Sequence, residues 1–115
     1  MDNQAKHIST ENIAIEHGHC GLIRKLNMNG PARIIDLKVQ DAERHYHKKT
    51  TEYYYILEGT GQVYLDGQLS DVQSGDLITI PPGVVHQAIC DKNDMLKILV
   101  IEVPPAIGDV HRVDN

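Results

Sequence analysis

The stretch HYHKKTTEYYYILEG, residues 45–59, combines two histidines one residue apart, a short polar segment, Glu52 and a run of three tyrosines. In a β-strand, residues i and i+2 point to the same face, about 6.6 Å apart along the chain. His45 and His47 therefore project together, and their imidazoles can converge on one point. Nitrogen and oxygen donors held against an apolar segment are the kind of set that binds a transition metal.

Two further residues are expected to join this pair. The four residues KKTT after His47 have the length of a hairpin loop, which would bring Glu52 opposite His47 on the same face. A second predicted hairpin, LITI-PPG-VVHQAI, carries His86 three residues after its turn. Three neutral imidazoles and one carboxylate suit Fe, Mn, Co, Ni or Zn and leave coordination positions open for water or substrate. By the same period of two, Tyr54 follows Glu52 inward and is the candidate general acid or base.

Short β-rich runs separated by turn signals about every ten residues predict an antiparallel sandwich or barrel. The dipeptide Asp66-Gly67 is a strong signal for a two-residue hairpin, and Gly59-Thr60-Gly61 is interpreted as another turn. No segment of useful length has the 3.6-residue apolar period of a helix. The expected strands are Gly21–Leu26, Arg33–Val39, His45–His47, Tyr53–Leu57, Gln62–Leu65, Leu77–Ile80, Val84–Ile89 and Leu96–Val103.

Composition narrows the classes of function. The chain has 115 residues, 41% of them hydrophobic, which is enough for one domain with a real core. Phe and Trp are absent, so the core must come from Ile, Leu, Val and the tyrosines. A net charge of −5 without a dense basic cluster argues against nucleic-acid binding and an anionic membrane surface. A polar N-terminus and the lack of a long apolar run make the cytoplasm the expected compartment.

The run LKILVIEV, Leu96–Val103, is apolar at nearly every position rather than at every second one. Both faces of such a strand should be covered. One face belongs to the core, and a second copy of the chain is expected to meet the other. The sequence therefore predicts a homodimer.

The spacing of these residues resembles the two sequence motifs of the cupins. The first motif reads G, five residues, H-x-H, three or four residues, E, six residues, G. Its matching part here is His45, His47, KKTT, Glu52, YYYILE and Gly59. The second motif reads G, five residues, P-x-G, two residues, H, three residues, N. Its matching part here is Gly75, DLITI, PPG, VV and His86. Two positions depart from the pattern, because the leading glycine of the first motif falls on Val39 and the closing asparagine of the second falls on Cys90.

This resemblance implies an all-β fold, a double-stranded β-helix or jelly-roll β-barrel, in a single cupin domain over residues 1–115. Motif 1 covers about residues 39–59 and motif 2 about residues 75–90. The resemblance also implies one divalent transition metal per chain, held by the four residues that match the family's ligand positions. These are His45, His47, Glu52 and His86.

Cupins differ widely in activity, so the fold leaves the function open. The favoured expectation is a metal-dependent dioxygenase, isomerase or decarboxylase that acts on a small oxygenated organic acid, ketone or sugar derivative. The alternative is a barrel that only binds or senses a small molecule. A third reading, from the Glu-x-Tyr pair Glu52 and Tyr54, is similarity to cupin lyases that cleave dimethylsulfoniopropionate.

Other polar residues receive plainer interpretations. His17 and His19 lie next to Gly18 and Gly21 and are interpreted as part of a solvated loop. Lys48 and Lys49 are expected at an exposed hairpin tip. Arg33 faces inward by parity with Ile35 and Leu37 and could pair with a substrate carboxylate.

Overall fold

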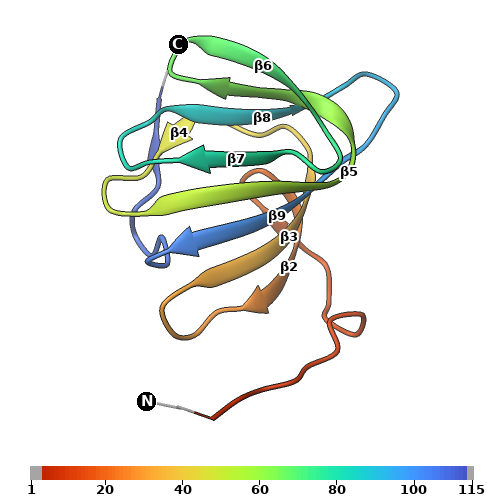
Figure 1. Cartoon of the computed structure of the whole chain (residues 1–115), viewed down its shortest axis with the longest axis vertical. Coiled ribbons are helices and arrows are strands. Elements are labelled where there is room, and N and C mark those ends of the chain that lie inside the picture. The colour runs from red at the N-terminus through yellow and green to blue at the C-terminus, as the bar shows by residue number, and fades with distance from the viewer. Residues whose placement is uncertain (1–3, 114–115) are drawn as a thin grey trace.

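The computed structural model describes residues 4–113, and every regular element among them is a β-strand. The strands are β1 (Glu16–Gly18), β2 (Gly21–Asn27), β3 (Arg33–Val39), β4 (His45–Tyr46), β5 (Thr51–Leu65), β6 (Gln68–Gln73), β7 (Leu77–Ile80), β8 (His86–Cys90), β9 (Leu96–Val103) and β10 (His111–Arg112). All pairings are antiparallel, and the strands curl into a jelly-roll β-barrel (Figure 1). The all-β jelly roll expected from the sequence is confirmed. Within residues 4–113, no helix has the length and apolar character that a membrane crossing needs.

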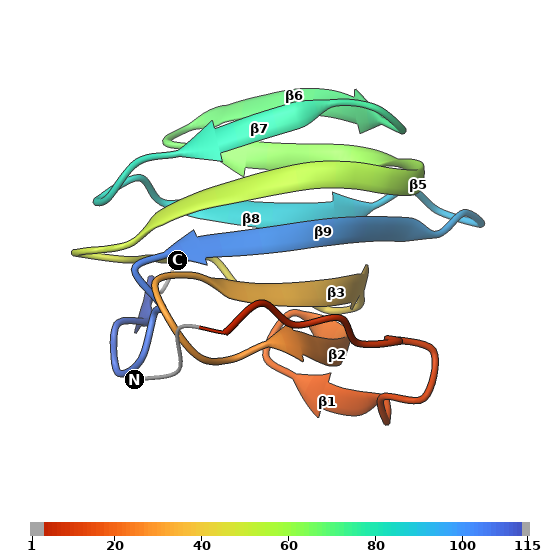
Figure 2. The ribbon, with the colours of Figure 1, turned by 60° about the horizontal axis from the view of Figure 1, so that its bottom comes forward.

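Strand β5 joins the two faces of the barrel. Its first half pairs with β7 and β9, and its second half pairs with β6 and β8. The strand order is β1-β2-β3-β9-β5-β8-β4-β10, with β6 and β7 also paired to β5. Figure 2 shows β1 to β3 at one end of the molecule and β6 with β7 at the other. The inner faces of these strands enclose the core.

The turn predicted at Gly59-Thr60-Gly61 is wrong, because these residues lie inside the continuous strand β5. Gly59 has a φ of 87° and follows an irregularity in the pairing with β9, between Ile56 and Glu58. A Cβ atom at Gly59 would collide with the carbonyl oxygen of Met95. The glycine therefore bends the strand from one face of the barrel to the other instead of ending it.

The hairpin at Asp66-Gly67 is confirmed. Leu65 pairs directly with Gln68, and both turn residues have positive φ, 45° and 96°. This is the conformation that a two-residue hairpin turn requires. Strand β6 beyond the turn was missed by the sequence analysis, because Val72 is its only buried residue and the apolar alternation is too weak to recognise.

The hairpins predicted at KKTT and at PPG are wrong. Both segments instead connect one face of the barrel to the other. Strand β4 pairs with β8 and β10, while the β5 residues that follow it pair with β7 and β9. Likewise β7 pairs with β5 on one face and β8 lies on the other. The two connections contact each other, since Gly83 N–H donates to the carbonyl oxygen of His47 at 2.7 Å. Both crossing points therefore carry metal-ligand candidates to the same place.

The core consists almost entirely of Ile, Leu and Val side chains. Of the five tyrosines, only Tyr54 is buried, at 2% exposure, whereas Tyr55 is 43% exposed. The expectation that the tyrosines fill the core therefore holds for Tyr54 alone. The inward-facing residues of β9 are buried in the core. The outward-facing Leu99 and Ile101 are only half-buried, so the outer face of this strand is not fully covered within one chain.

Candidate metal centre

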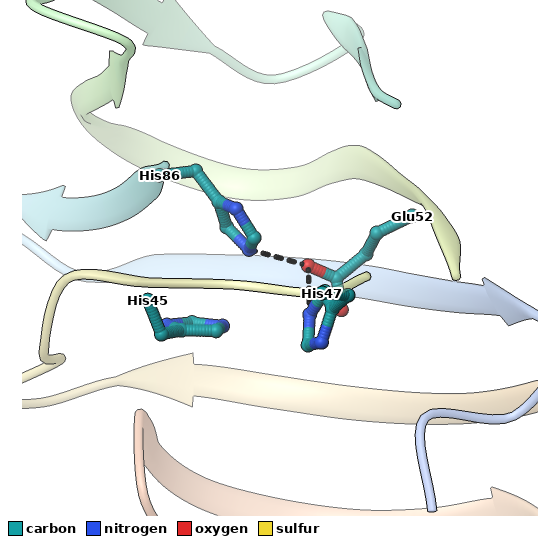
Figure 3. Close-up of side chains that lie close together, drawn as sticks. All are labelled: His45, His47, Glu52 and His86. Carbon is teal, nitrogen blue, oxygen red and sulfur yellow. Dashed lines mark ion pairs between the residues drawn. The ribbon is translucent and has the colours of Figure 1, made fainter. Parts of the chain in front are cut away.

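The structure brings His45, His47, Glu52 and His86 together inside the barrel (Figure 3). One ligand atom from each residue lies within 4.8 Å of the others, and none of the four residues is more than 3% exposed. His45 and His86 are directly paired across β4 and β8. Glu52 comes from the start of β5, where it pairs with Ile80 and Glu102.

The backbone fixes the orientation of all three imidazoles. Nδ1 of His45 lies 2.9 Å from the Glu43 carbonyl oxygen, and Nδ1 of His86 lies 2.9 Å from that of Val84. Nδ1 of His47 lies 2.6 Å from the carbonyl oxygen of Asp109. Because a carbonyl oxygen only accepts, each Nδ1 must carry a hydrogen, which leaves the neutral ring an Nε2 lone pair.

These lone pairs meet the carboxylate of Glu52. Its Oε1 lies 2.9 Å from Nε2 of His86 and 3.6 Å from Nε2 of His47. Neither nitrogen nor this oxygen has a hydrogen-bond partner among the described residues. Buried acceptors that face one another at such distances are costly unless a proton or a cation lies between them. The donor set therefore fits a bound metal ion on the structure's own geometry.

The buried environment shifts the pKa values of the candidate ligands in different directions. Burial lowers the pKa of His45 to about 4, so this imidazole is neutral near pH 7. Burial would also lower the pKa of His47, but the Glu52 carboxylate outweighs it and raises that pKa. Burial opposes ionisation of Glu52, yet the adjacent imidazoles of His47 and His86 hold its pKa far below the usual range. The carboxylate is thus ionised, and its negative charge attracts a cation.

A pocket opens beside the four residues, along the inner faces of β2, β3, β9 and β5. It has an empty volume of about 480 Å³, part of which is open to solvent. Tyr54 lines it with its ring edge toward His86, at 6.0 Å between ring centroids. Burial, and after it the nearby Glu52 charge, raises the pKa of Tyr54 well above 10. The inward position expected for Tyr54 is confirmed, and its phenol keeps its proton.

Sequence reasoning missed three residues around the centre. His19 is exposed, as expected for a loop, but its ring meets that of His45 edge-on at 4.9 Å, at the pocket. Glu102 is buried beside Arg33. Its position could have been predicted, because it lies on the same face of an apolar strand as Ile98 and Val100. Asp109 could not have been predicted from local sequence, because the residue that it contacts, His47, is 62 positions away.

Asp109 holds the segment that carries His47. Its carboxylate accepts the backbone N–H groups of Lys48 and Lys49 at 2.8 and 2.9 Å, while its carbonyl accepts from His47. The two backbone N–H groups keep the pKa of Asp109 well below its usual range. Strand β10 follows at once and pairs with β4. The C-terminal segment therefore fixes the orientation of His47 through the ring nitrogen that faces away from Glu52.

Replacing Asp109 with alanine should lower the melting temperature of the metal-free protein and weaken metal binding by roughly 10- to 100-fold. The folded-state pKa of Asp109 is depressed, so its stabilising contribution is complete above the usual carboxyl pKa of about 4 and is lost as the pH falls through the folded-state value. The gap in melting temperature between wild type and Asp109→Ala should therefore narrow below about pH 4. Thermal unfolding from pH 7 to pH 3 measures this gap.

The control is Asp71→Ala, which removes an exposed carboxylate on β6. It should match wild type in metal affinity and melting temperature. An Asp109→Ala protein that behaves like this control at every pH would show that the C-terminal segment does not support the centre.

Comparisons with known proteins agree with this architecture. A family model described as Cupin domain matches residues 33–102. Quercetin 2,3-dioxygenase of Bacillus subtilis is 36% identical over 92 residues, which are 76% of this chain and 25% of that protein. An uncharacterised protein of Methanocaldococcus jannaschii is 44% identical over 61 residues, or 53% of this chain and 49% of that protein. The chain thus spans about a quarter and about half of the lengths of these relatives.

A solved structure gives the same fold. The polyketide cyclase RemF from Streptomyces resistomycificus superposes with a TM-score of 0.80 at 21% identity, covering 97% of this chain and 87% of that one. At this level of identity the likeness concerns the fold.

Proposed function

We propose, starting from the fact that this chain belongs to the cupin family, that it is a metal-dependent enzyme acting on a small oxygenated organic molecule. The observation that carries the proposal is the geometry at Glu52, whose buried Oε1 lies 2.9 Å from Nε2 of His86 and 3.6 Å from Nε2 of His47, contacts that need a cation or a proton between them. The four ligands would be His45, His47, Glu52 and His86, holding one divalent Fe, Mn, Ni, Co or Zn ion. When bound, such an ion acts as a Lewis acid toward carboxylate, carbonyl or hydroxyl oxygen, and iron can also activate O₂.

The chain's own residues supply the rest of the chemistry. Ile35, Leu37 and Val100 form an apolar wall beside the ligands and limit the access of water. Tyr54 presents a phenol that keeps its proton because of burial and the Glu52 charge. We assign Tyr54 the role of general acid, which donates the proton from its Oη to a substrate oxygen in the pocket. Relationship to quercetin 2,3-dioxygenase supports a dioxygenase among the candidate reactions.

The test reconstitutes the metal-free protein anaerobically with each of the five ions. Turnover is then followed by oxygen uptake and by proton NMR with small carboxylates, diketones and hydroxy-ketones. The proposal expects turnover with at least one ion and none after chelation. Metal-loaded protein that binds these compounds but converts none of them would contradict it and favour a barrel that only binds a ligand.

Tyr54→Phe should lower kcat by roughly 10²- to 10⁴-fold, because the variant removes only the proton donor. Its metal content and melting temperature should stay close to those of wild type. The matched control is Tyr55→Phe on the outward face of the same strand, where the side chain is 43% exposed. Full activity of Tyr54→Phe would remove this residue from the mechanism and leave the metal centre intact.

We also propose that a second copy of the chain covers the outer face of β7, β5 and β9. Tyr55 lies opposite Leu77 on one side and Leu99 on the other, so the apolar side chains form a continuous row. Leu77 is 63% exposed in the isolated chain. Sedimentation at micromolar concentration should show a dimer, and a species of only 12.9 kDa would contradict this proposal.

A further inference from the structure

One arginine, Arg33, is among the residues that line the pocket beside the metal centre. Arg33 begins β3 and lines the pocket together with buried aliphatic residues on β2, β3 and β9. Its side chain is 20% exposed, so it is mostly removed from bulk water. Aliphatic and cationic surfaces thus share one small space with the candidate ligands.

The guanidinium of Arg33 is only partly used by the protein. Its Nη1 contacts Oε1 of Glu102 at 3.3 Å, which is long for a charge-assisted hydrogen bond. The same Glu102 oxygen also accepts the N–H of Ala106 at 3.2 Å. Nε of Arg33 is buried and has no hydrogen-bond partner among the described residues. Since an arginine has five N–H donors in a planar fork, Arg33 keeps donors for a ligand.

The formal charges around the pocket determine what can bind there. Arg33 contributes a formal charge of +1, while Glu52 and Glu102 contribute −2 when both are ionised, so the formal sum over these lining residues is −1. Burial, and after it the Glu52 charge, raises the pKa of Glu102, and a cation at the four ligands offsets that second cause. A divalent ion at the four ligands changes this sum to +1. A monoanion then neutralises the pocket, whereas a dianion or a cation does not.

The walls restrict the rest of the ligand. The side chains of Ile23, Ile35, Leu37 and Val100 are all buried and line the pocket. A polyhydroxylated sugar would lose hydrogen bonds to water against this surface without replacing them. An alkyl or aryl group would gain from burial at about 25 cal/mol per Å².

We propose that this pocket binds a small monocarboxylate with an apolar body, and that Arg33 receives the carboxylate. The inference rests on the proposed function, because it needs the divalent ion to reverse the charge of the pocket. The apolar body lies along the aliphatic wall, and the opposite end of the molecule lies toward Glu52 and His45. Arg33 is thus the residue that selects acids over neutral compounds and sugars.

The experiment measures binding of hexanoate and of hexanamide, its neutral counterpart, by calorimetry. Each is titrated into the metal-loaded and metal-free forms of wild type, Arg33→Gln, Arg33→Lys and Arg24→Gln. Arg24 is the matched control, since it is an arginine of the neighbouring strand β2 that does not line this pocket. Glutamine at position 33 keeps a donor for Glu102, which protects the fold. Metal content is measured on every sample by plasma mass spectrometry.

Metal-loaded wild type should bind hexanoate about tenfold or more tightly than hexanamide, the scale of one charge-assisted hydrogen bond. Arg33→Gln should lose this preference while keeping its metal, and Arg33→Lys should keep part of it. Arg24→Gln should match wild type, and metal-free wild type should show no preference.

Two results overturn the inference and can be told apart. If wild type holds the metal but shows no preference for hexanoate, or if Arg33→Gln keeps the full preference, the carboxylate site is wrong and the proposed function stands. If wild type retains no metal under any reconstitution, the proposed function fails, and the carboxylate site fails with it because the pocket stays negative.

Discussion

Replacing His86 with alanine should weaken metal binding by about a hundredfold or more, since the loss of a partner behind a ligand alone costs roughly 10- to 100-fold. His86 is fully buried, and its Nε2 makes the shortest contact to Glu52 in the cluster, at 2.9 Å. Its Nδ1 lies 2.9 Å from the carbonyl oxygen of Val84, which fixes the orientation of the ring. Competition against a chelator of known affinity measures the loss.

The control is His17→Ala, because His17 is an exposed histidine on β1 outside the cluster. It should bind metal as wild type does. Circular dichroism shows whether His86→Ala is folded, and His47→Ala provides a second ligand variant should it not be. Folded ligand variants with the affinity of the control would refute the assignment of these histidines.

Removing the metal from wild type should lower the melting temperature by roughly 10 °C. A ligand present at 100 times its Kd stabilises the folded state by about 2.7 kcal/mol, and in a domain of this size each kcal/mol shifts the melting temperature by several degrees. Removing the ion also leaves the buried Oε1 of Glu52 and the Nε2 atoms of His47 and His86 without the cation that would satisfy them.

Differential scanning calorimetry with and without a chelator measures this shift. The same chelator added to His47→Ala serves as the control, because a protein that holds no ion has none to lose. An equal shift in both proteins would mean that the chelator, and not the centre, changes stability. No shift in either would contradict a stabilising metal.

Residues close in sequence made the ligand set predictable, because the His-x-His pair and the following glutamate keep fixed spacings along strands. The reason given for their convergence was partly wrong. KKTT does not close a paired hairpin, since β5 already pairs with β7 and β9. The segment instead crosses to the other face of the barrel, and His47 still returns beside Glu52. A period of two fixes which way a side chain points, but it does not fix which strand lies next to it.

The supporting residues were harder to foresee, because their contacts are made across long stretches of chain. Asp109 contacts His47 and the two lysines from the C-terminal segment, where the sequence shows neither a strand pattern nor a motif that points to them. Glu102 was readable in principle, since a charged residue at an inward position of an apolar strand requires a partner. That partner is Arg33, on the neighbouring strand.

The most direct test of a metal centre at His45, His47, Glu52 and His86 is the metal content of the protein purified without an affinity tag and without added metal. Plasma mass spectrometry on wild type should find close to one transition-metal ion per chain. The same measurement on His47→Ala should find almost none. Wild type that carries no more metal than His47→Ala, even after anaerobic reconstitution, would contradict the account.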